Sequence, residues 1–221
     1  MIIKSFDAVI FDLWNTLIPL PETIKERAFR ETASVLGTNP SLLIGPWVET
    51  RAHRETRDLL EYFFWLRGIL GADWSDEDIK EAMRVRKSIH GMAFQTIDED
   101  TVKVLRALRA RGLKTAVVSN CSSDVRELLS ASVLGTLLDV VVLSSEIGIM
   151  KPDLRIYTYA ASLLGVACNR CVYVGDGYDN ELEGAAAVGM HPLLLASGSK
   201  QRWSGPHVTT LWAVLEEVGV R

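Results

Sequence analysis

The stretch Ala8-Val9-Ile10-Phe11-Asp12 decides the fold, because four apolar residues end abruptly at a carboxylate. A continuous apolar run of this length is typical of a strand that is buried on both faces, as in a parallel sheet. Three further runs have the same form: TAVV at 115–118 before Ser119, VVVL at 140–143 before Ser144, and CVYV at 171–174 before Gly175-Asp176. PLLL at 192–195 is a fifth candidate strand.

Helical patterns separate these candidate strands. Segments 98–111, 125–134 and 154–164 carry apolar residues at helical spacing, and a glycine follows the first and the third, where it is a natural stop. A polar loop at 197–200 precedes a last predicted helix at about 210–218. Strands that alternate with helices predict an α/β protein with a Rossmann-like, doubly wound parallel sheet and right-handed crossovers.

One interval, from about 22 to 94, breaks this alternation because it contains no convincing strand. Two sets of apolar residues each fall on one helical face: Ile24, Ala28, Phe29, Ala33 and Leu36, then Leu59, Phe63, Leu66 and Leu70. Ser75 and Asp78 predict a capping box that opens a helix over 76–89. We therefore expect an inserted α-helical cap at 21–94, and a catalytic core made of residues 1–20 and 95–221.

Composition excludes several other classes of protein. The chain has 221 residues, which suits one domain with an insertion, and 24 basic against 28 acidic residues give a net charge of -4. That balance argues against general nucleic-acid binding, and no apolar stretch approaches the length of a membrane span. Three cysteines are too few for a disulfide framework and favour a reducing compartment. We predict a cytoplasmic protein without nucleic-acid or membrane partners; its oligomeric state is not predicted.

Polar residues gather where the predicted strands end, and ligands bind at this edge of an open parallel sheet. Asp12 and Asp176 follow two of the strands, and carboxylates from two strand ends can share a divalent cation such as Mg²⁺. Ser119-Asn120 follow a third strand, and Lys151 stands near the start of a helix, where it can neutralise a phosphate. This set suits electrostatic stabilisation of phosphoryl transfer.

Four segments in this order resemble the four motifs of the haloacid dehalogenase-like (HAD) hydrolase superfamily. They are FDLWNTL at 11–17, VVSN at 117–120, KPDLRIY at 151–157 and VGDGYDNELEGA at 174–185. The helical interval after the first segment resembles the helical cap that some members carry between the first and second motifs. The resemblance implies a hydrolase that acts on a small, anionic substrate, and favours a Mg²⁺-dependent phosphatase of a phosphorylated metabolite.

Carried over residue by residue, the resemblance also implies roles in catalysis. Asp12 would be the nucleophile that forms a covalent aspartyl intermediate. Ser119 and the amide of Asn120 would bind the transferring group, and Lys151 would steady the charge on Asp12 and on the substrate.

The same resemblance implies a magnesium site. Asp12, Asp176 and the backbone carbonyl of Trp14 would hold Mg²⁺. Glu181 stands where many relatives have Asp, so it would be an outer ligand or hold a water molecule. The longer side chain keeps the charge of that position.

Trp14 is the main departure from the pattern of the phosphatases in this superfamily. These usually have Asp two residues after the nucleophile, where it protonates the leaving oxygen and later activates water. Indole does neither. Trp14 either fills space between cap and core or stacks on the substrate, and His90 is a candidate substitute acid. Within the basic cluster of Arg51, His53, Arg54 and Arg57, one side chain is a candidate to enter the cleft, although a solvated helix face is the simpler interpretation.

Two other functions remain open from the sequence. Dehalogenases of this superfamily carry an aromatic Tyr at the position of Trp14, which makes a 2-haloacid dehalogenase the first alternative. Those enzymes typically lose the acidic fourth motif, whereas Gly175-Asp176 is intact here. The second alternative is a metabolite-binding protein that retains the fold without catalysis.

Overall fold

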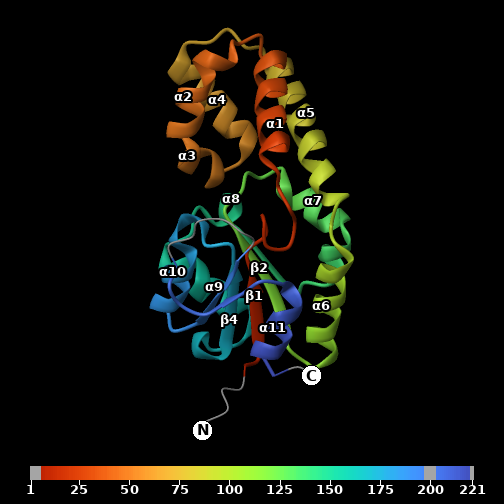
Figure 1. Ribbon diagram of the computed structural model, residues 1–221. Coiled ribbons are helices and arrows are strands. Elements are labelled where there is room, and N and C mark those ends of the chain that lie inside the picture. The colour runs from red at the N-terminus through yellow and green to blue at the C-terminus, as the bar shows by residue number, and fades with distance from the viewer. Residues whose placement is uncertain (1–5, 197–202, 220–221) are drawn as a thin grey trace.

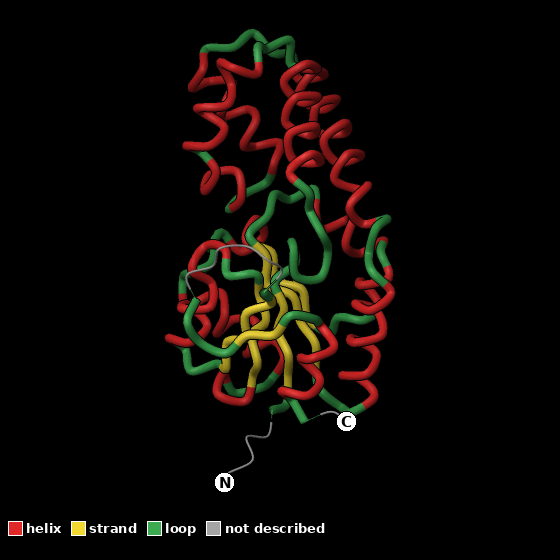
Figure 2. The backbone as a smooth tube through the Cα atoms, viewed as in Figure 1, coloured by secondary structure: helices red, strands yellow, loops and turns green. Residues whose placement is uncertain are grey.

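The computed structural model describes residues 6–196 and 203–219, and a parallel sheet lies between helices in the lower part of the molecule as drawn in Figure 2. Six strands in the described residues are ordered β3-β2-β1-β4-β5-β6, and every neighbouring pair is parallel. The strands are β1 (Ala8–Phe11), β2 (Lys114–Ser119), β3 (Val140–Leu143), β4 (Cys171–Gly175), β5 (His191–Leu195) and β6 (His207–Val208). The predicted α/β class and doubly wound sheet are confirmed.

Alternate residues of β1 face opposite sides of the sheet, as the period of a strand requires. Ala8 and Ile10 pack on one side in a cluster with residues of α9 (Leu154–Leu164) and α10 (Glu181–Ala187). Val9 and Phe11 pack on the other side with residues of α6 (Glu99–Ala110), α7 (Val125–Ala131) and α11 (Leu211–Glu217). All four β1 side chains are fully buried, which is why this run is apolar throughout.

Five helices lie between β1 and α6 in the chain, and we call them the helical insert. They are α1 (Glu22–Val35), α2 (Pro40–Glu49), α3 (Arg51–Glu55), α4 (Leu59–Leu70) and α5 (Asp76–Phe94). The insert stands above the carboxyl ends of the strands, with α1 and α5 side by side (Figure 1). It has its own apolar cluster around Leu43, Tyr62 and Phe63. As the sequence predicts, the insert contains helices and no strand in the described residues.

Helix α5 begins as predicted and ends later than predicted. Ser75 and Asp78 form both hydrogen bonds of the capping box. The helix then continues to Phe94, five residues past the predicted end. Its buried face continues as well, since His90 and Ala93 follow Ile79 at helical spacing and are buried. This extension carries α5 from the insert down to the sheet.

Other local differences have local causes. Helix α7 stops at Ala131 because the Ser132 side chain accepts a hydrogen bond from the Leu134 backbone and caps a short 3₁₀ turn, Val133–Thr136. Helix α8 (Ser144–Ile147) follows β3 directly and was not predicted; it ends at Gly148, whose φ of 70° favours glycine.

The edge strand β6 has only two residues, too few to produce an apolar pattern in the sequence. The predicted polar loop at 197–200 lies outside the described residues. Throughout the described part of the chain, no helix combines the length and the apolar character needed to cross a membrane.

Candidate active site

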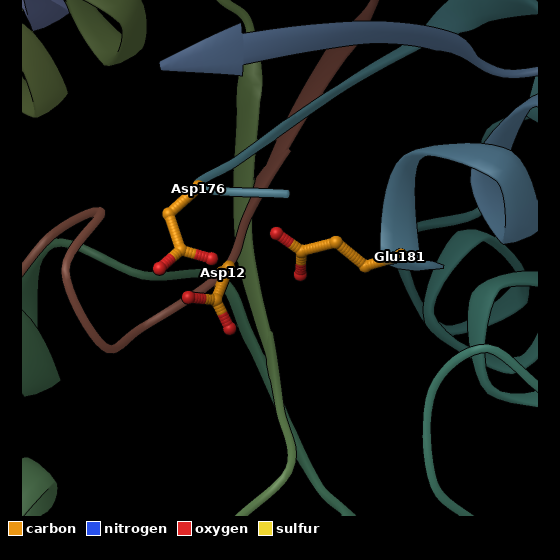
Figure 3. A group of neighbouring side chains, drawn as sticks. All are labelled: Asp12, Asp176 and Glu181. Atoms are coloured by element: carbon orange, nitrogen blue, oxygen red, sulfur yellow. The ribbon is translucent and has the colours of Figure 1, made fainter. Parts of the chain in front are cut away.

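The site forms where β1 and β4, neighbours in the sheet, end beside each other. Phe11 is in register with Val174, so the residues that follow these strands emerge at the same edge. Asp12 follows β1, Asp176 follows β4, and Glu181 begins α10. Figure 3 shows the three carboxylates facing one another, and one oxygen from each lies within 4.8 Å of the others. The structure thus brings three predicted site residues together from separate parts of the chain.

Lys151 connects two of these carboxylates. Its Nζ donates to Asp12 Oδ1 at 2.5 Å and to Glu181 Oε2 at 2.5 Å, and it lies 3.0 Å from the Tyr173 hydroxyl. Asp12, Lys151 and Glu181 are all buried. Removing one partner from a buried ion pair leaves an uncompensated charge, so this network strongly fixes the position of each side chain.

Burial and charge set the protonation of this network. Burial raises the pKa of Asp12 to about 7; Lys151 opposes the rise, and the charges of Glu181 and Asp176 add to it. Burial by itself would lower the pKa of Lys151, but Asp12 and Glu181 outweigh it and raise that pKa above its ordinary value. Lys151 is therefore a fixed cation beside a carboxyl group whose pKa is raised by burial. Any additional cation at the site would favour the ionised form of Asp12.

Glu181 is held on all sides by protein donors. Oε2 accepts from Lys151 and from the Tyr173 hydroxyl at 2.7 Å, and Oε1 accepts from the Gly177 backbone N–H at 3.0 Å. The side chain lies directly over Gly175, where a Cβ would come within 2.0 Å of Oε1. Only glycine at position 175 leaves room for the longer acid, so these two residues form one packing unit.

The donor set fits a hard divalent cation. Asp12, Asp176 and Glu181 offer carboxylate oxygens while Lys151 pairs with only Asp12 and Glu181 of these, and Mg²⁺ prefers oxygen ligands of this kind. Both Glu181 oxygens accept hydrogen bonds, and the half-buried Asp176 accepts one at Oδ1 from the Tyr178 backbone N–H at 2.9 Å. Asn15, with a φ of 59°, turns the chain after β1 and donates to Asp176 Oδ2 at 3.4 Å.

The second predicted motif has two different environments. Ser119 is fully buried at the end of β2 and does not line the cavity that lies between the three carboxylates and the helical insert. Asn120 lines that cavity, but its side chain is engaged by protein groups. Its Nδ2 donates to the Lys151 carbonyl at 3.0 Å and to Asp179 Oδ2 at 2.8 Å, and its Oδ1 accepts from the Lys151 N–H at 2.8 Å. Asn120 therefore holds Lys151 in place through the backbone.

Comparison with known proteins agrees with this geometry. The sequence profile of haloacid dehalogenase-like hydrolases matches residues 6–189. The chain belongs to this family.

Individual members of the HAD family differ in their described activities. Phosphatase MT3486 of Mycobacterium tuberculosis is 31% identical over 97% of this chain and 99% of its own length. The crystal structure of a HAD phosphatase from Thermococcus onnurineus has a TM-score of 0.72 and 20% identity, covering 98% of this chain and 99% of that chain. (S)-2-haloacid dehalogenase 4A of Burkholderia cepacia is 26% identical over 79% of this chain and 76% of its own.

In this HAD hydrolase a cavity of about 450 Å³ separates the carboxylates from the helical insert. Asp12, Lys151 and Asp176 line its floor, and residues of the insert line its wall, among them Trp47, Arg54, Arg86 and His90. Trp14 is half-buried in the same cavity, with its ring centroid 5.7 Å from that of Phe94 and 6.3 Å from that of His90. The volume suits a small metabolite.

An ion pair joins the insert to the core beside this cavity. The Arg51 guanidinium donates to both Asp179 oxygens, at 2.8 and 2.7 Å, and Asp179 also accepts from Asn120. Burial would raise the pKa of Asp179, but hydrogen bonds from Arg51 and Asn120 outweigh it and hold the pKa below its ordinary value. This contact closes one side of the site with an ionised carboxylate.

Several site residues were missed by the sequence interpretation. Asp179 and Tyr173 lie inside or beside the fourth motif, but nothing in their spacing indicates a partner on the insert or on Lys151. The position of Arg86 could have been recognised from the sequence, because it lies on the buried face of α5, four residues before His90. A charged residue on an otherwise apolar helical face indicates a buried polar contact. Within the basic cluster, Arg51 and Arg54 line the cavity and Arg57 is exposed.

Proposed function

We propose that this HAD hydrolase is a Mg²⁺-dependent phosphatase of a small phosphorylated metabolite, acting through an aspartyl-phosphate on Asp12, with the helical insert as its cap. The observation that carries the proposal is the cluster of Asp12, Asp176 and Glu181, whose ligand oxygens lie within 4.8 Å of one another, with Lys151 paired to Asp12 and Glu181. Phosphoryl transfer needs positive charge close to the phosphate oxygens, and a cation held by this cluster would supply it. A phosphatase of 31% identity that spans nearly the whole chain supports the same assignment.

In the proposed reaction the Asp12 carboxylate attacks phosphorus, forming a new O–P bond as the bond to the leaving oxygen breaks. Lys151 holds the attacking carboxylate in position and offsets its negative charge. Water then cleaves the acyl phosphate, which releases inorganic phosphate and restores Asp12. Mg²⁺ held by Asp12, Asp176 and the Trp14 carbonyl, with Glu181 behind them, would supply Lewis-acid stabilisation of the phosphate oxygens when bound.

The proton for the leaving group does not come from position 14. General acid catalysis contributes about 10²–10⁴-fold in typical enzymes, and the Trp14 indole has no titratable proton to give. The leaving oxygen therefore departs as an anion or receives a proton from the insert. We expect slow turnover of alkyl phosphates for this reason.

A 2-haloacid dehalogenase is the second candidate, and Trp14 is the observation that favours it. A halide needs no proton on departure, so that reaction does not require an acid at position 14 and is compatible with an aromatic residue there. The dehalogenase of 26% identity is consistent with this alternative. The acidic cluster is the argument against it, because displacement of halide by Asp12 requires no bound cation.

The test is a comparison of phosphate and chloride release by the purified protein. We expect p-nitrophenyl phosphate to be hydrolysed with Mg²⁺ and not after treatment with EDTA. Chloride release from 2-chloropropionate without added metal, and no phosphate release, would instead identify a dehalogenase. If neither product forms, a binding protein without catalysis becomes the better description.

Asp12→Asn is the control for the site of chemistry. An amide is a poor nucleophile, so we expect activity to fall by at least about a hundredfold. Thermal unfolding of the variant shows whether the fold is retained. Activity within a few-fold of wild type would rule out Asp12 as the nucleophile.

A further inference from the structure

Two buried guanidinium groups of the helical insert line the same cavity as Asp12. Arg54 comes from α3 and Arg86 from α5, and their side chains are 7% and 10% exposed. Both lie against the same indole ring, with Cζ atoms 4.1 and 5.2 Å from the Trp47 centroid. Two arginines from different helices are thus gathered at one place on the cavity wall.

The hydrogen-bonding capacity of these two arginines is only partly used. Arg54 donates from Nη1 to the Trp47 carbonyl at 2.6 Å and lies 3.6 Å from Glu55. Arg86 donates from Nη2 to Ser122 at 3.3 Å and lies 3.6 Å from Asp124. Within the described part of the chain, the buried Nε of each arginine has no hydrogen-bond partner. A guanidinium offers five N–H donors, and leaving them buried and unpaired is unfavourable.

The neighbouring acids are shared with other groups. Both Glu55 oxygens accept from Arg51 at 3.1 Å, and Asp124 accepts from Ser122 at 2.6 Å and lies 3.3 Å from His90. Burial lowers the pKa of Arg86; Asp124 opposes this and the nearby Arg54 adds to it. An anion between the two arginines would supply acceptors that these acids do not.

Arg51 is an arginine of this site whose guanidinium is hydrogen-bonded to acidic partners. It makes a bidentate pair with Asp179 and a further contact with Glu55, so its role is to join the insert to the core. Arg51 therefore differs from Arg54 and Arg86, which line the cavity and each have a buried Nε without a hydrogen-bond partner in the described part of the chain.

We propose that Arg54 and Arg86 bind a second anionic group of the substrate, a carboxylate or a second phosphate, while the reacting phosphate lies at Asp12. This inference rests on the proposed phosphatase function and adds the class of substrate: a small metabolite with anionic groups at both ends. Guanidinium groups suit both carboxylate and phosphate because their planar N–H donors match pairs of oxygens.

The test uses pairs of substrates that differ in the second anion. One pair is 3-phosphoglycerate and glycerol 3-phosphate, and the other is fructose 1,6-bisphosphate and fructose 6-phosphate. We expect kcat/KM to be at least about tenfold higher for the member with two anionic groups in one of the pairs, since charge-assisted hydrogen bonds are strong. The pair that shows the preference identifies the second group as carboxylate or phosphate. A ratio near one in both pairs would overturn the proposal and leave the phosphatase assignment intact.

Variants connect that preference to the two arginines. Arg54→Gln and Arg86→Gln should each bring the ratio close to one. Arg54→Lys and Arg86→Lys keep the charge without the planar donors. They replace the glutamine variants in this test if a glutamine variant does not fold. Arg84→Gln is the matched control, because Arg84 is on α5 with its side chain 71% exposed. A ratio that is unchanged in the folded Arg54 and Arg86 variants would assign the preference to other residues and overturn the proposal.

A binding measurement separates this inference from failure of the proposed function. Phosphonoacetate carries a phosphonate and a carboxylate but cannot be hydrolysed, and methylphosphonate lacks the carboxylate. If no phosphate ester is hydrolysed, the phosphatase assignment fails. A larger rise in melting temperature with phosphonoacetate than with methylphosphonate, lost in Arg86→Gln, would still establish the second anion site. Equal rises in melting temperature with the two phosphonates would overturn the second anion site as well.

Discussion

Trp14 places a large aromatic ring where the chemistry of a phosphatase calls for an acid. Its ring packs against Phe94 and His90 at the lower end of α5, so it connects the loop after β1 to the insert. Close to Trp14 in the site, Asp12 accepts a hydrogen bond from Lys151. In the proposed reaction, Lys151 therefore positions the nucleophile Asp12, while position 14 supplies no proton to the leaving group.

Leaving-group chemistry tests this interpretation of Trp14. For the wild-type protein we expect kcat/KM to fall steeply as the leaving-group pKa rises, because the departing oxygen receives no proton. Trp14→Asp should restore a carboxylate and increase turnover of alkyl phosphates more than that of aryl phosphates. A series of aryl and alkyl phosphates, assayed with both proteins, gives the two slopes.

The substitution removes a partly buried ring, so its effect on folding has to be measured separately. Replacing a large aromatic side chain in a packed site costs on the order of a few kcal/mol. If kcat/KM of the wild-type protein does not depend on the leaving-group pKa, a residue other than Trp14 already provides the proton. His90, in the cavity wall, is then the first residue to mutate.

Helix α5 is the element that joins the two parts of the molecule. It begins at the capping box of Ser75 and packs along α1, and its lower end meets α7 of the core. At this contact His90 Nδ1 lies 3.3 Å from Asp124 Oδ2, and both side chains are buried. Burial would raise the pKa of Asp124, but His90 and Arg86 hold it below its ordinary value. The junction therefore depends on the charge states of buried groups.

Acidification should weaken this junction. Burial and the nearby Arg86 and Arg54 lower the pKa of His90 below its ordinary 6.5, although Asp124 opposes them. As pH falls below 6.5, the unfolded chain takes up a proton that the folded protein excludes, so stability is lost in this range. The loss is at most about 1.4 kcal/mol for each pH unit.

His90→Asn keeps a donor near Nδ1 and removes the titration. We expect the free energy of unfolding in urea to fall less from pH 8 to pH 5 in this variant than in wild type. The value at pH 8, where the imidazole is neutral in both states, gives the baseline. Equal pH dependence of the two proteins would show that His90 does not contribute.

At the scale of the whole molecule, the candidate metal site exists only after folding. Asp12 and Asp176 are separated along the chain by the insert and three strands, and they meet because β1 and β4 are neighbours in the sheet. An ion that binds the native state alone stabilises it by mass action, by about 2.7 kcal/mol at a hundred times its dissociation constant. Binding of Mg²⁺ is therefore measurable without knowledge of the substrate.

We expect Mg²⁺ to raise the melting temperature by several degrees, since about 1 kcal/mol shifts it by about 2–4 °C in a protein of this size. Asp176→Asn should remove most of this response, while Asp73→Asn, at an exposed position of the insert, should keep it. Differential scanning fluorimetry across a Mg²⁺ titration measures both. An Asp176 variant that responds like wild type would place the ion elsewhere.

The sequence alone determined the architecture and the main chemical groups of the site. Apolar runs such as residues 8–11 and 171–174 predict strands because both faces of a buried parallel strand must be apolar. This pattern can be recognised from a few consecutive residues, without knowing which elements pack against them. The same holds for Asp12 and Asp176, which follow their strands directly, and for the helical periodicity of the insert. The two-residue strand β6 and the 3₁₀ turn after α7 produce no such period, so they were not predicted.

Only the tertiary structure decided which residues meet across the site. The hydrogen bonds that use both Glu181 oxygens, the pairing of Arg51 with Asp179, and the arginines on the Trp47 ring join residues from different elements. Sequence patterns report whether a side chain is buried, because burial follows the period of its own helix or strand. They do not report the partner, since a buried charge is stabilised by whichever groups the packing of separate elements brings within reach.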